Sequence, residues 1–263
     1  MITAIGVDIG SLTTKSVVLN ETKIISTAVI RSSDETELCA RTTIEQALQQ
    51  IGLSFNPDIK VIATGLGSKS VTFSQSKSLT ACLARGVNSI YPTARMAIDM
   101  GAESSTIIKL NERGRLTDWL SQDKCAAGTG VFLEQMAKLM NLTSAEMDAL
   151  SFKAKFPPEI TNTCAVFAES EVISHVHRVP ATLREDIAAG IYRSVLGRII
   201  SMCKRIGIQR EVVATGGVAM NKGIIAILNQ ELGFDILVPD NPQIVAALGA
   251  AIIAREATTG AKM

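Results

Sequence analysis

The stretch that decides the fold is the run of residues 5–19, which reads IGVDIGSLTTKSVVL. Both halves are rich in branched residues in the pattern of a strand, and a glycine turn separates them, so the stretch predicts a β-hairpin. Backbone amides at a glycine turn can approach a phosphate closely, and the carboxylate of Asp8 suits a hydrated Mg²⁺. Because turns favour Asp and Gly for structural reasons as well, this stretch alone does not establish a phosphate site.

A second hairpin of the same design follows in residues 94–110, which read ARMAIDMGAESSTIIKL. Two further segments match each other, because residues 60–67 and 211–218 are both short apolar strands that deliver Ala-Thr-Gly to a turn. The order of hairpin, helix and Ala-Thr-Gly strand therefore occurs twice and indicates an internal duplication. We expect an α/β fold of two similar halves with a cleft between them.

A third stretch combines two kinds of chemistry. Residues 123–130 read DKCAAGTG and lead directly into the apolar-periodic run 131–140. A small-residue loop that opens a helix presents free backbone N–H groups and the positive end of the helix dipole, so we expect it to hold an anion. The anion is a phosphate at the turn or a thiolate at Cys125.

The composition is that of a globular protein with a sizeable core, since 47% of the 263 residues are hydrophobic. The formal net charge is +1 and there is no long charge run, so the sequence gives no indication of a nucleic-acid-binding surface. No basic region precedes Asp8, and no apolar run reaches the roughly 18 to 20 residues of a membrane span. We therefore expect a cytoplasmic protein that binds neither nucleic acid nor membrane.

The five cysteines form no C-x-x-C pair and are odd in number, so we expect reduced thiols. Apolar periodicity predicts helices over residues 42–50, 78–87, 187–206 and 245–255. We interpret Cys39, Cys82 and Cys203 as small core residues. The double proline in residues 153–158 predicts an exposed connection.

These motifs carry a resemblance to a known family. Two D-x-G hairpins and a late T-G-G strand resemble the phosphate and adenosine signatures of the actin, sugar-kinase (hexokinase) and heat-shock-chaperone ATPase superfamily. Within it, residues 123–130 together with residues 163–174, TCAVFAESEVIS, resemble the activators (component A) of 2-hydroxyacyl-CoA dehydratases and the ATP-binding subunits of benzoyl-CoA reductase. The resemblance runs from Ile5 to about Ala254. It implies two duplicated ribonuclease-H-like (actin-like ATPase) subdomains around a nucleotide cleft, in residues 1–92 and 93–263.

The resemblance further implies a homodimer with one 4Fe-4S cluster shared by two subunits, each supplying Cys125 and Cys164. From the residues alone, each of these cysteines is either structural or a ligand, because a lone buried cysteine is usually structural. Both precede a predicted helix N-terminus, where the helix dipole favours an anionic thiolate. Two thiolates per chain, doubled by symmetry, give the four ligands that a cubane needs.

The resemblance also implies which residues bind ATP or ADP and Mg²⁺. The first phosphate loop matches at Asp8, Gly10, Ser11, Leu12, Thr13 and Lys15, and the second at Asp99, Gly101, Ala102 and Glu103. The loop before the apolar-periodic run 131–140 contributes Gly128, Thr129 and Gly130. The adenosine is framed by Gly216, Gly217, Val218 and Asn221, with Gln243 nearby. Glu134 either reaches the ribose or lies on a solvated helix face. The candidate catalytic residues are Asp8, Asp99 and Glu103.

The chain departs from the family pattern at the second phosphate loop. Residues 101–104 read GAES where the family usually has GGQD, and Thr106 stands at a usual lysine position. The first loop has Leu12 where a hydroxylated residue is common. A glutamate at position 103 can act as a base as well as orient water, but it repels the γ-phosphate. ATP hydrolysis is therefore either faster or lost, and nucleotide binding is the firmer expectation.

The implied activity is ATP-gated transfer of one low-potential electron. The donor would be ferredoxin or flavodoxin, and the acceptor a partner 2-hydroxyacyl-CoA dehydratase or acyl-CoA reductase. Two other classes stay open. One is a small-molecule kinase of the same superfamily, with incidental cysteines and with Glu103 as base. The other is a scaffold that binds a nucleotide without turnover.

Overall fold

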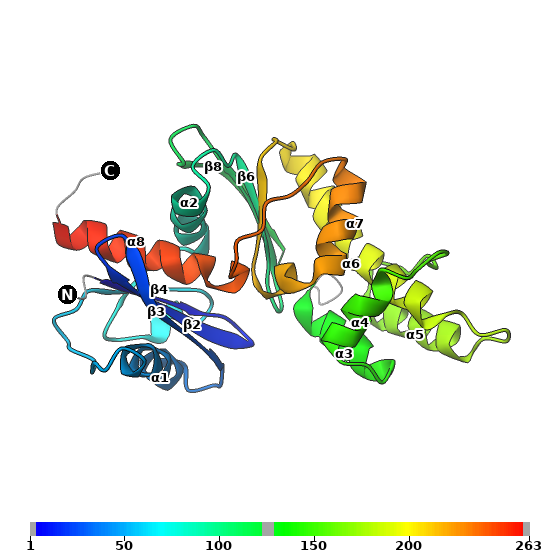
Figure 1. The fold of residues 1–263 in the computed structure, drawn as a ribbon, viewed down its shortest axis with the longest axis horizontal. Coiled ribbons are helices and arrows are strands. Elements are labelled where there is room, and N and C mark those ends of the chain that lie inside the picture. The colour runs from blue at the N-terminus through cyan, green and yellow to red at the C-terminus, as the bar shows by residue number, and fades with distance from the viewer. Residues whose placement is uncertain (1–3, 123–128, 260–263) are drawn as a thin grey trace. The chain divides into compact units, whose positions relative to one another are not determined.

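A computed structural model describes residues 4–122 and 129–259. Contacts divide the chain into two units (Figure 1). Unit 1 comprises Met1–Ala97, Ile108–Asp118 and Asp240–Met263, and unit 2 comprises Ile98–Ile107 and Trp119–Pro239. The predicted subdomain boundary between residues 92 and 93 stays a prediction.

Groups of successive strands are separated by one or more helices along the chain. The strands are β1 (Ala4–Ile9), β2 (Thr13–Asn20), β3 (Lys23–Arg31), β4 (Val61–Thr64), β5 (Gln75–Ser76), β6 (Met96–Met100), β7 (Ser105–Leu110), β8 (Leu116–Gln122) and β9 (Val212–Thr215). The helices are α1 (Thr36–Gln49), α2 (Leu79–Ile90), α3 (Gly130–Leu139), α4 (Ser144–Ser151), α5 (Ala165–His177), α6 (Arg184–Ile206), α7 (Lys222–Leu232) and α8 (Val245–Thr259). The short 3₁₀ turns are η1 (Ser68–Ser70), η3 (Gly217–Met220) and η4 (Pro242–Ile244).

The strands form two sheets with a shared order. The five-stranded sheet runs β3-β2-β1-β4-β5 and the four-stranded sheet runs β8-β7-β6-β9. In each sheet the predicted hairpin lies between a third strand and the Ala-Thr-Gly strand. β1 pairs with β2 in antiparallel register, which sets Asp8 opposite Lys15, and with β4 in parallel register, which sets Asp8 opposite Thr64. The predicted hairpins and their duplication are therefore confirmed.

The duplication extends to two glycines at the ends of the Ala-Thr-Gly strands. Gly65 and Gly216 both have φ of +86°, in the left-handed region that favours glycine. A Cβ on Gly65 would lie 2.5 Å from the carbonyl oxygen of Ile9, and one on Gly216 would lie 2.3 Å from that of Met100. Ile9 and Met100 each follow the hairpin aspartate. Both halves therefore require glycine for the same two reasons, conformation and close approach.

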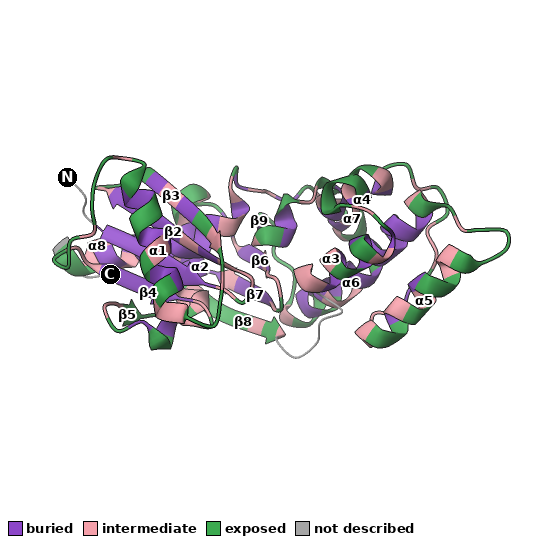
Figure 2. Cartoon of the chain, turned by 90° about the horizontal axis from the view of Figure 1, so that it is seen from below, coloured by how far each residue is buried: buried purple, intermediate pink, exposed green. Residues whose placement is uncertain are grey.

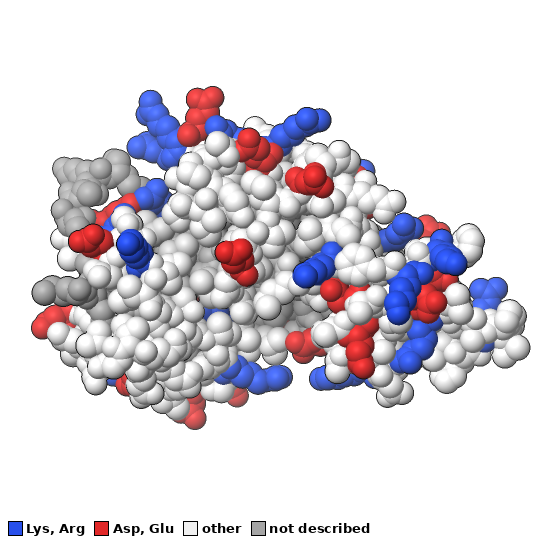
Figure 3. All heavy atoms as spheres, in the orientation of Figure 1, with Lys and Arg blue, Asp and Glu red and all other residues white. Residues whose placement is uncertain are grey.

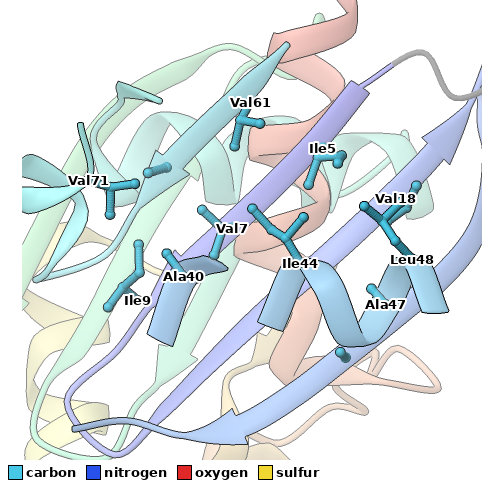
Figure 4. Close-up of a cluster of buried hydrophobic side chains, with 12 residues drawn as sticks. Ile5, Val7, Ile9, Val18, Ala40, Ile44, Ala47, Leu48, Val61 and Val71 are labelled. Carbon is cyan, nitrogen blue, oxygen red and sulfur yellow. The ribbon is translucent and has the colours of Figure 1, made fainter. Parts of the chain in front are cut away.

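The sheet of unit 1 is covered on both faces. Figure 4 shows Ile5, Val7 and Ile9 of β1 facing the apolar side of α1, where Ile44 and Leu48 are buried. The opposite face packs against α8 through residues that include Val17, Leu19, Ala247, Leu248 and Ala251. Every residue of β1 is consequently buried, as the predicted apolar run requires.

The longest helix, α6, supplies much of the core of unit 2. Fourteen of its 23 residues are buried, whereas α5 buries only Ala168 and Val172 (Figure 2). Burial of β-branched and leucine side chains at helical spacing accounts for the predicted helix over residues 187–206, which begins at Arg184. The predicted connection over residues 153–158 contains no helix or strand, and Asp186 accepts the N–H groups of Lys155 and Phe156 at 2.7 and 2.8 Å.

Candidate functional site

The first predicted phosphate loop is a tight turn at the end of β1. The N–H of Gly10 donates to the carbonyl of Thr13 at 3.1 Å, and the Ser32 hydroxyl donates to the carbonyl of Gly10 at 2.8 Å. Asp8 is 7% exposed, and one of its carboxylate oxygens lies 3.3 Å from the Lys15 Nζ. The hairpin thus places a carboxylate and a cation beside a small-residue turn, which is an arrangement suited to phosphate and a hydrated cation.

Two further residues of this loop, Ser11 and Leu12, lie at its tip, where Ser11 is exposed and Leu12 is half-buried. Sequence reasoning missed Ser32, which follows β3 and also bonds the hydroxyl of Thr14 at 2.9 Å. A serine next to a strand end carries no local signal for this role. Only the third strand of the sheet brings it to the turn.

The second predicted phosphate loop repeats this turn in unit 2. The N–H of Gly101 donates to the carbonyl of Ser104 at 2.8 Å, which leaves Glu103 exposed at the tip. Asp99 accepts a hydrogen bond of 2.8 Å from the Thr215 hydroxyl at the end of β9. The hydroxyl of Thr106, at the position of the usual lysine, lies 2.8 Å from that of Ser121. The turn is therefore preserved while its ionic surroundings differ.

The start of α3 is joined to this second loop. The N–H groups of Gly130 and Val131 donate to the carbonyls of Gly101 and Ala102 at 3.0 and 2.9 Å. We predicted free N–H groups at this helix N-terminus, and for these two residues that prediction is wrong, because the neighbouring turn already uses them. Thr129, the N-cap, is 2% exposed. Of the predicted site residues in this loop, Cys125 and Gly128 lie outside the described residues. Thr129 and Gly130 are described, and the second turn holds Gly130 through its N–H.

The predicted adenosine residues follow β9 in the same unit. Gly216 approaches Met100, Gly217 has open space around it, and a Cβ on Gly130 would lie 3.1 Å from the Val218 side chain. Asn221 occupies the N-cap position of α7, but its side chain makes no capping hydrogen bond. It donates instead to the carbonyl of Val218 at 3.0 Å. Asp99, Gly101, Gly130 and this loop therefore form one connected group.

Two further predicted nucleotide residues belong to other elements. Gln243 belongs to η4 in unit 1, and Glu134 is a half-buried residue in the second turn of α3. Sequence reasoning also missed Asp148 of α4, whose carboxylate accepts the N–H groups of Gly223 and Lys222 at 2.8 and 3.2 Å. Asp148 thereby satisfies the first amides of α7, a role that only tertiary structure reveals.

Cys164 occupies the N-cap position of α5. It is half-exposed, and its side chain makes no capping hydrogen bond. Gln135 of α3 donates to Glu169 of α5 at 3.1 Å, so the helix after each predicted cysteine ligand contacts the other. Cys125 lies outside the described residues. In the described part of the chain, no three His, Cys, Asp or Glu side chains lie close enough together to hold a metal ion.

The three remaining cysteines are core residues, as predicted. Cys39, Cys82 and Cys203 are buried. Burial raises the pKa of Cys82 to about 11 and that of Cys203 to about 12, because a thiolate is poorly solvated in an apolar environment. Both thiols are therefore neutral at physiological pH and unsuited to ligation without large rearrangement.

One face of the molecule illustrates the distribution of charge. On the face drawn in Figure 3, basic and acidic side chains are interspersed, in keeping with the formal net charge of +1. Over residues 4–122 and 129–259, none of the helices combines the length and apolar character needed to cross a bilayer.

The chain is similar in sequence to known proteins over nearly its whole length. Residues 5–254 match the BadF/BadG/BcrA/BcrD ATPase family. The chain is 43% identical over 251 residues to the 2-hydroxyisocaproyl-CoA dehydratase activator of Clostridioides difficile, which covers 95% of this chain and 93% of that protein.

Two solved structures are similar over nearly their full length. The activator of the 2-hydroxyisocaproyl-CoA dehydratase from Clostridium difficile, with bound ADPNP, superposes with a TM-score of 0.92 at 41% identity, covering 99% of this chain and 96% of that one. Component A of the (R)-2-hydroxyglutaryl-CoA dehydratase of Acidaminococcus fermentans gives 0.90 at 34% identity, covering 97% and 98%. The predicted α/β fold with actin-like ATPase subdomains is confirmed.

Proposed function

The chain belongs to the BadF/BadG/BcrA/BcrD ATPase family, and from that premise we propose that it is an ATP-dependent activator that delivers one low-potential electron to a partner 2-hydroxyacyl-CoA dehydratase or related acyl-CoA reductase. The observation that carries the proposal is the junction between the Gly101–Ala102 turn and the first amides of α3. It ties a nucleotide-binding turn to the helix that follows the loop of Cys125. An activator needs such a connection, because its nucleotide has to influence the cluster.

In this proposal the nucleotide is bound by the two hairpins and the loop after β9. Backbone amides of the Gly10 and Gly101 turns, with Lys15, contact the phosphates of ATP or ADP. Asp8 and Asp99 hold the hydrated Mg²⁺, since carboxylates are its preferred protein ligands. Gly216 to Val218 and Asn221 frame the adenosine, and Glu103 activates or orients the attacking water. The ADPNP bound in the similar structure supports nucleotide binding by this chain.

The cluster ligands in this proposal are Cys125 and Cys164 of two subunits. Cys164 fits the role, because its half-exposed thiol stands at the N-terminus of a 13-residue helix, where the dipole favours a thiolate. A bound 4Fe-4S cluster would supply reversible one-electron chemistry at low potential. The residues of this chain contribute the thiolates, their orientation and the surrounding charge.

Dimerisation next to Cys164 is supported by exposed apolar residues. Val166 and Phe167, in the first turn of α5, are 66% and 65% exposed. Large apolar side chains left in water next to a functional residue are typical of an interface. We therefore place the two-fold axis of a homodimer beside this turn. Ferredoxin or flavodoxin would reduce the dimer in the cytoplasm, and the dehydratase or reductase would accept the electron.

The test is to measure iron and acid-labile sulfide per dimer in protein purified without oxygen. The parent is expected to bind four irons per dimer, and Cys125→Ser and Cys164→Ser are each expected to lose them. Cys203→Ala is the matched control, since that thiol is buried and should leave the iron content unchanged.

A parent that binds no iron after reconstitution would overturn the proposal. Transfer of the γ-phosphate to a small-molecule hydroxyl, unaffected by Cys164→Ser, would then identify a kinase. Thermal stabilisation by ATP without phosphate release would instead identify a scaffold.

A further inference from the structure

The chain that leads into Cys164 lies along one face of α6. The Ser194 hydroxyl donates to the carbonyl of Thr161 at 2.7 Å. Two glycines make this approach possible, because a Cβ on Gly190 would lie 2.7 Å from the carbonyl oxygen of Pro158 and one on Gly197 would lie 2.6 Å from the side-chain nitrogen of Asn162. Residues 190, 194 and 197 recur at helical spacing, so they share a face. That face therefore lies against the segment of residues 158–162.

The same face ends in a charged clamp. Arg198 donates from Nε to the carbonyl of Asn162 and from a terminal nitrogen to the carbonyl of Thr163. These are the two residues immediately before Cys164. Arginine suits such a contact, because its planar guanidinium presents several donors in a fixed fork and stays charged at all relevant pH.

A carboxylate holds the segment from the other side. Glu171 of α5 accepts the N–H of Thr161 at 2.7 Å, and the Thr161 hydroxyl accepts the N–H of Thr163 at 3.3 Å. The three residues before Cys164 are therefore fixed through their backbone atoms by α5 and α6 together. Little of this depends on the side chains of the segment itself.

We propose that Arg198 is the positioning residue for Cys164: it fixes the main chain that orients the thiol and places a permanent positive charge next to it. The proposal rests on the proposed function for the role of Cys164 as a cluster ligand. A cation beside an anionic centre favours the state with the extra electron, so Arg198 raises the reduction potential of a cluster bound there. Orientation and charge are separable effects, and different substitutions of Arg198 isolate them.

The experiment compares Arg198→Gln and Arg198→Lys with Arg193→Gln, whose parent residue is an exposed arginine of the same helix. Hydrogen exchange at residues 161–164 is measured first, in iron-free protein. Loss of the charged fork should speed exchange about tenfold in Arg198→Gln, because hydrogen bonds from charged groups hold a segment closed by that order. Arg198→Lys should exchange at an intermediate rate, and Arg193→Gln at the parent rate.

The midpoint potential of the reconstituted dimer is measured second. Arg198→Gln should shift it to a lower value, while Arg198→Lys restores the charge and returns the potential toward that of the parent. Parent-like exchange and parent-like potential in a folded, four-iron Arg198→Gln dimer would overturn the inference. If Arg198→Gln does not fold, Arg198→Lys decides by its exchange rate. A parent without iron would refute the proposed function instead, and the exchange measurement would still test the clamp.

Discussion

The two hairpins share a turn but differ in what the turn is attached to. In each, the glycine two residues after the aspartate donates its N–H to the residue three positions on, Gly10 to Thr13 at 3.1 Å and Gly101 to Ser104 at 2.8 Å. The carbonyl of Gly10 accepts from the Ser32 hydroxyl, within its own sheet. The equivalent carbonyl of Gly101 accepts from the N–H of Gly130, the first residue of α3.

The two hairpin aspartates, Asp8 and Asp99, also differ in whether their partner belongs to the same hairpin. Asp8 faces the cation of Lys15 from its own hairpin, whereas Asp99 accepts a hydrogen bond from Thr215 of the Ala-Thr-Gly strand. Seven residues after Asp99, where the first hairpin has Lys15, the second has Thr106. The turn of the first hairpin is therefore held within unit 1 alone, whereas the turn of the second hairpin is joined to helix α3, which follows the cysteine loop. In the proposed function, the second hairpin is therefore the one through which a bound nucleotide acts at a distance.

The largest expected effect concerns the two glycines that follow the Ala-Thr strands, because both halves use them in the same conformation. Gly216→Ala should destabilise the protein by at least about 3 kcal/mol, because a left-handed φ is combined with a Cβ forced against the backbone of Met100. Gly65→Ala should cost somewhat less, about 2 kcal/mol, since one of its closest atoms is the Asp8 side chain, which can move. Denaturant unfolding measures both.

Gly233→Ala is the control for conformation without crowding. Gly233 has φ of +75° at the end of α7 with nothing within 4 Å of an added Cβ, so it should cost about 1 kcal/mol. Equal losses in all three variants would break the comparison, because close approach would then contribute nothing.

The next effect concerns Glu103 at the tip of the second turn, the position that is equivalent to Leu12 in the first turn. Glu103→Ala should lower kcat for ATP hydrolysis about 100-fold, the usual range for loss of a general base or water-orienting group. Because Glu103 is exposed, stability should not change. Glu103→Gln separates the two roles: it keeps activity if orienting water suffices and loses it if proton removal is required. Hydrolysis at the parent rate in Glu103→Ala would exclude Glu103 from the reaction.

A smaller effect is expected when the hydrogen bond between the second turn and α3 is removed. Gly130→Pro removes the N–H that bonds the Gly101 carbonyl, and proline is well tolerated at the first position of a helix after an extended residue such as Thr129. ATP stimulation of electron delivery to the partner should fall about tenfold, the order of one lost hydrogen bond.

The matched control is Gly130→Ala, which adds a Cβ near Val218 but keeps the N–H. It should retain the stimulation. If the two variants behave alike, crowding rather than the hydrogen bond explains the loss. Ser32→Ala removes the equivalent hydrogen bond, to the Gly10 carbonyl of the first hairpin. It should lower the free energy of unfolding but leave the ATP stimulation of electron delivery unchanged.

Sequence patterns were sufficient where burial dictates residue type. The hairpins, both Ala-Thr-Gly strands and the long helix α6 follow from apolar periodicity and glycine turns. The third strands β3 and β8 were not predicted, because much of their length is exposed and their alternation is weak. Helix α1 begins at Thr36 rather than at residue 42, because its first turns are polar and bury mainly Cys39 and Ala40.

The candidate site residues stand in motifs that the sequence shows, whereas the hydrogen bonds that hold them could not be predicted from it. Asp8, Asp99 and the glycines of the turns stand in recognisable motifs. Their partners are distant in sequence, because Ser32 follows β3 and Thr215 ends β9. Asp148 likewise reaches α7 from a helix far away in sequence. The amides at the start of α3 illustrate the limit, since a helix N-terminus predicts available donors but says nothing of a neighbouring turn that uses them.

The smallest expected effect separates the two threonines of the Ala-Thr-Gly strands. Thr215→Val should cost about 1 to 2 kcal/mol, because it removes the hydrogen bond to Asp99 from a buried hydroxyl. The Thr64 hydroxyl is equally buried, but among the described residues its neighbour is the Cys82 thiol, a weak partner, and it makes no conventional hydrogen bond. Thr64→Val should therefore change the free energy of unfolding by less than about 0.5 kcal/mol. Equal losses measured by denaturant unfolding would mean that Thr64 supports Asp8 as Thr215 supports Asp99, and the two halves would then be more alike than their hydrogen bonds indicate.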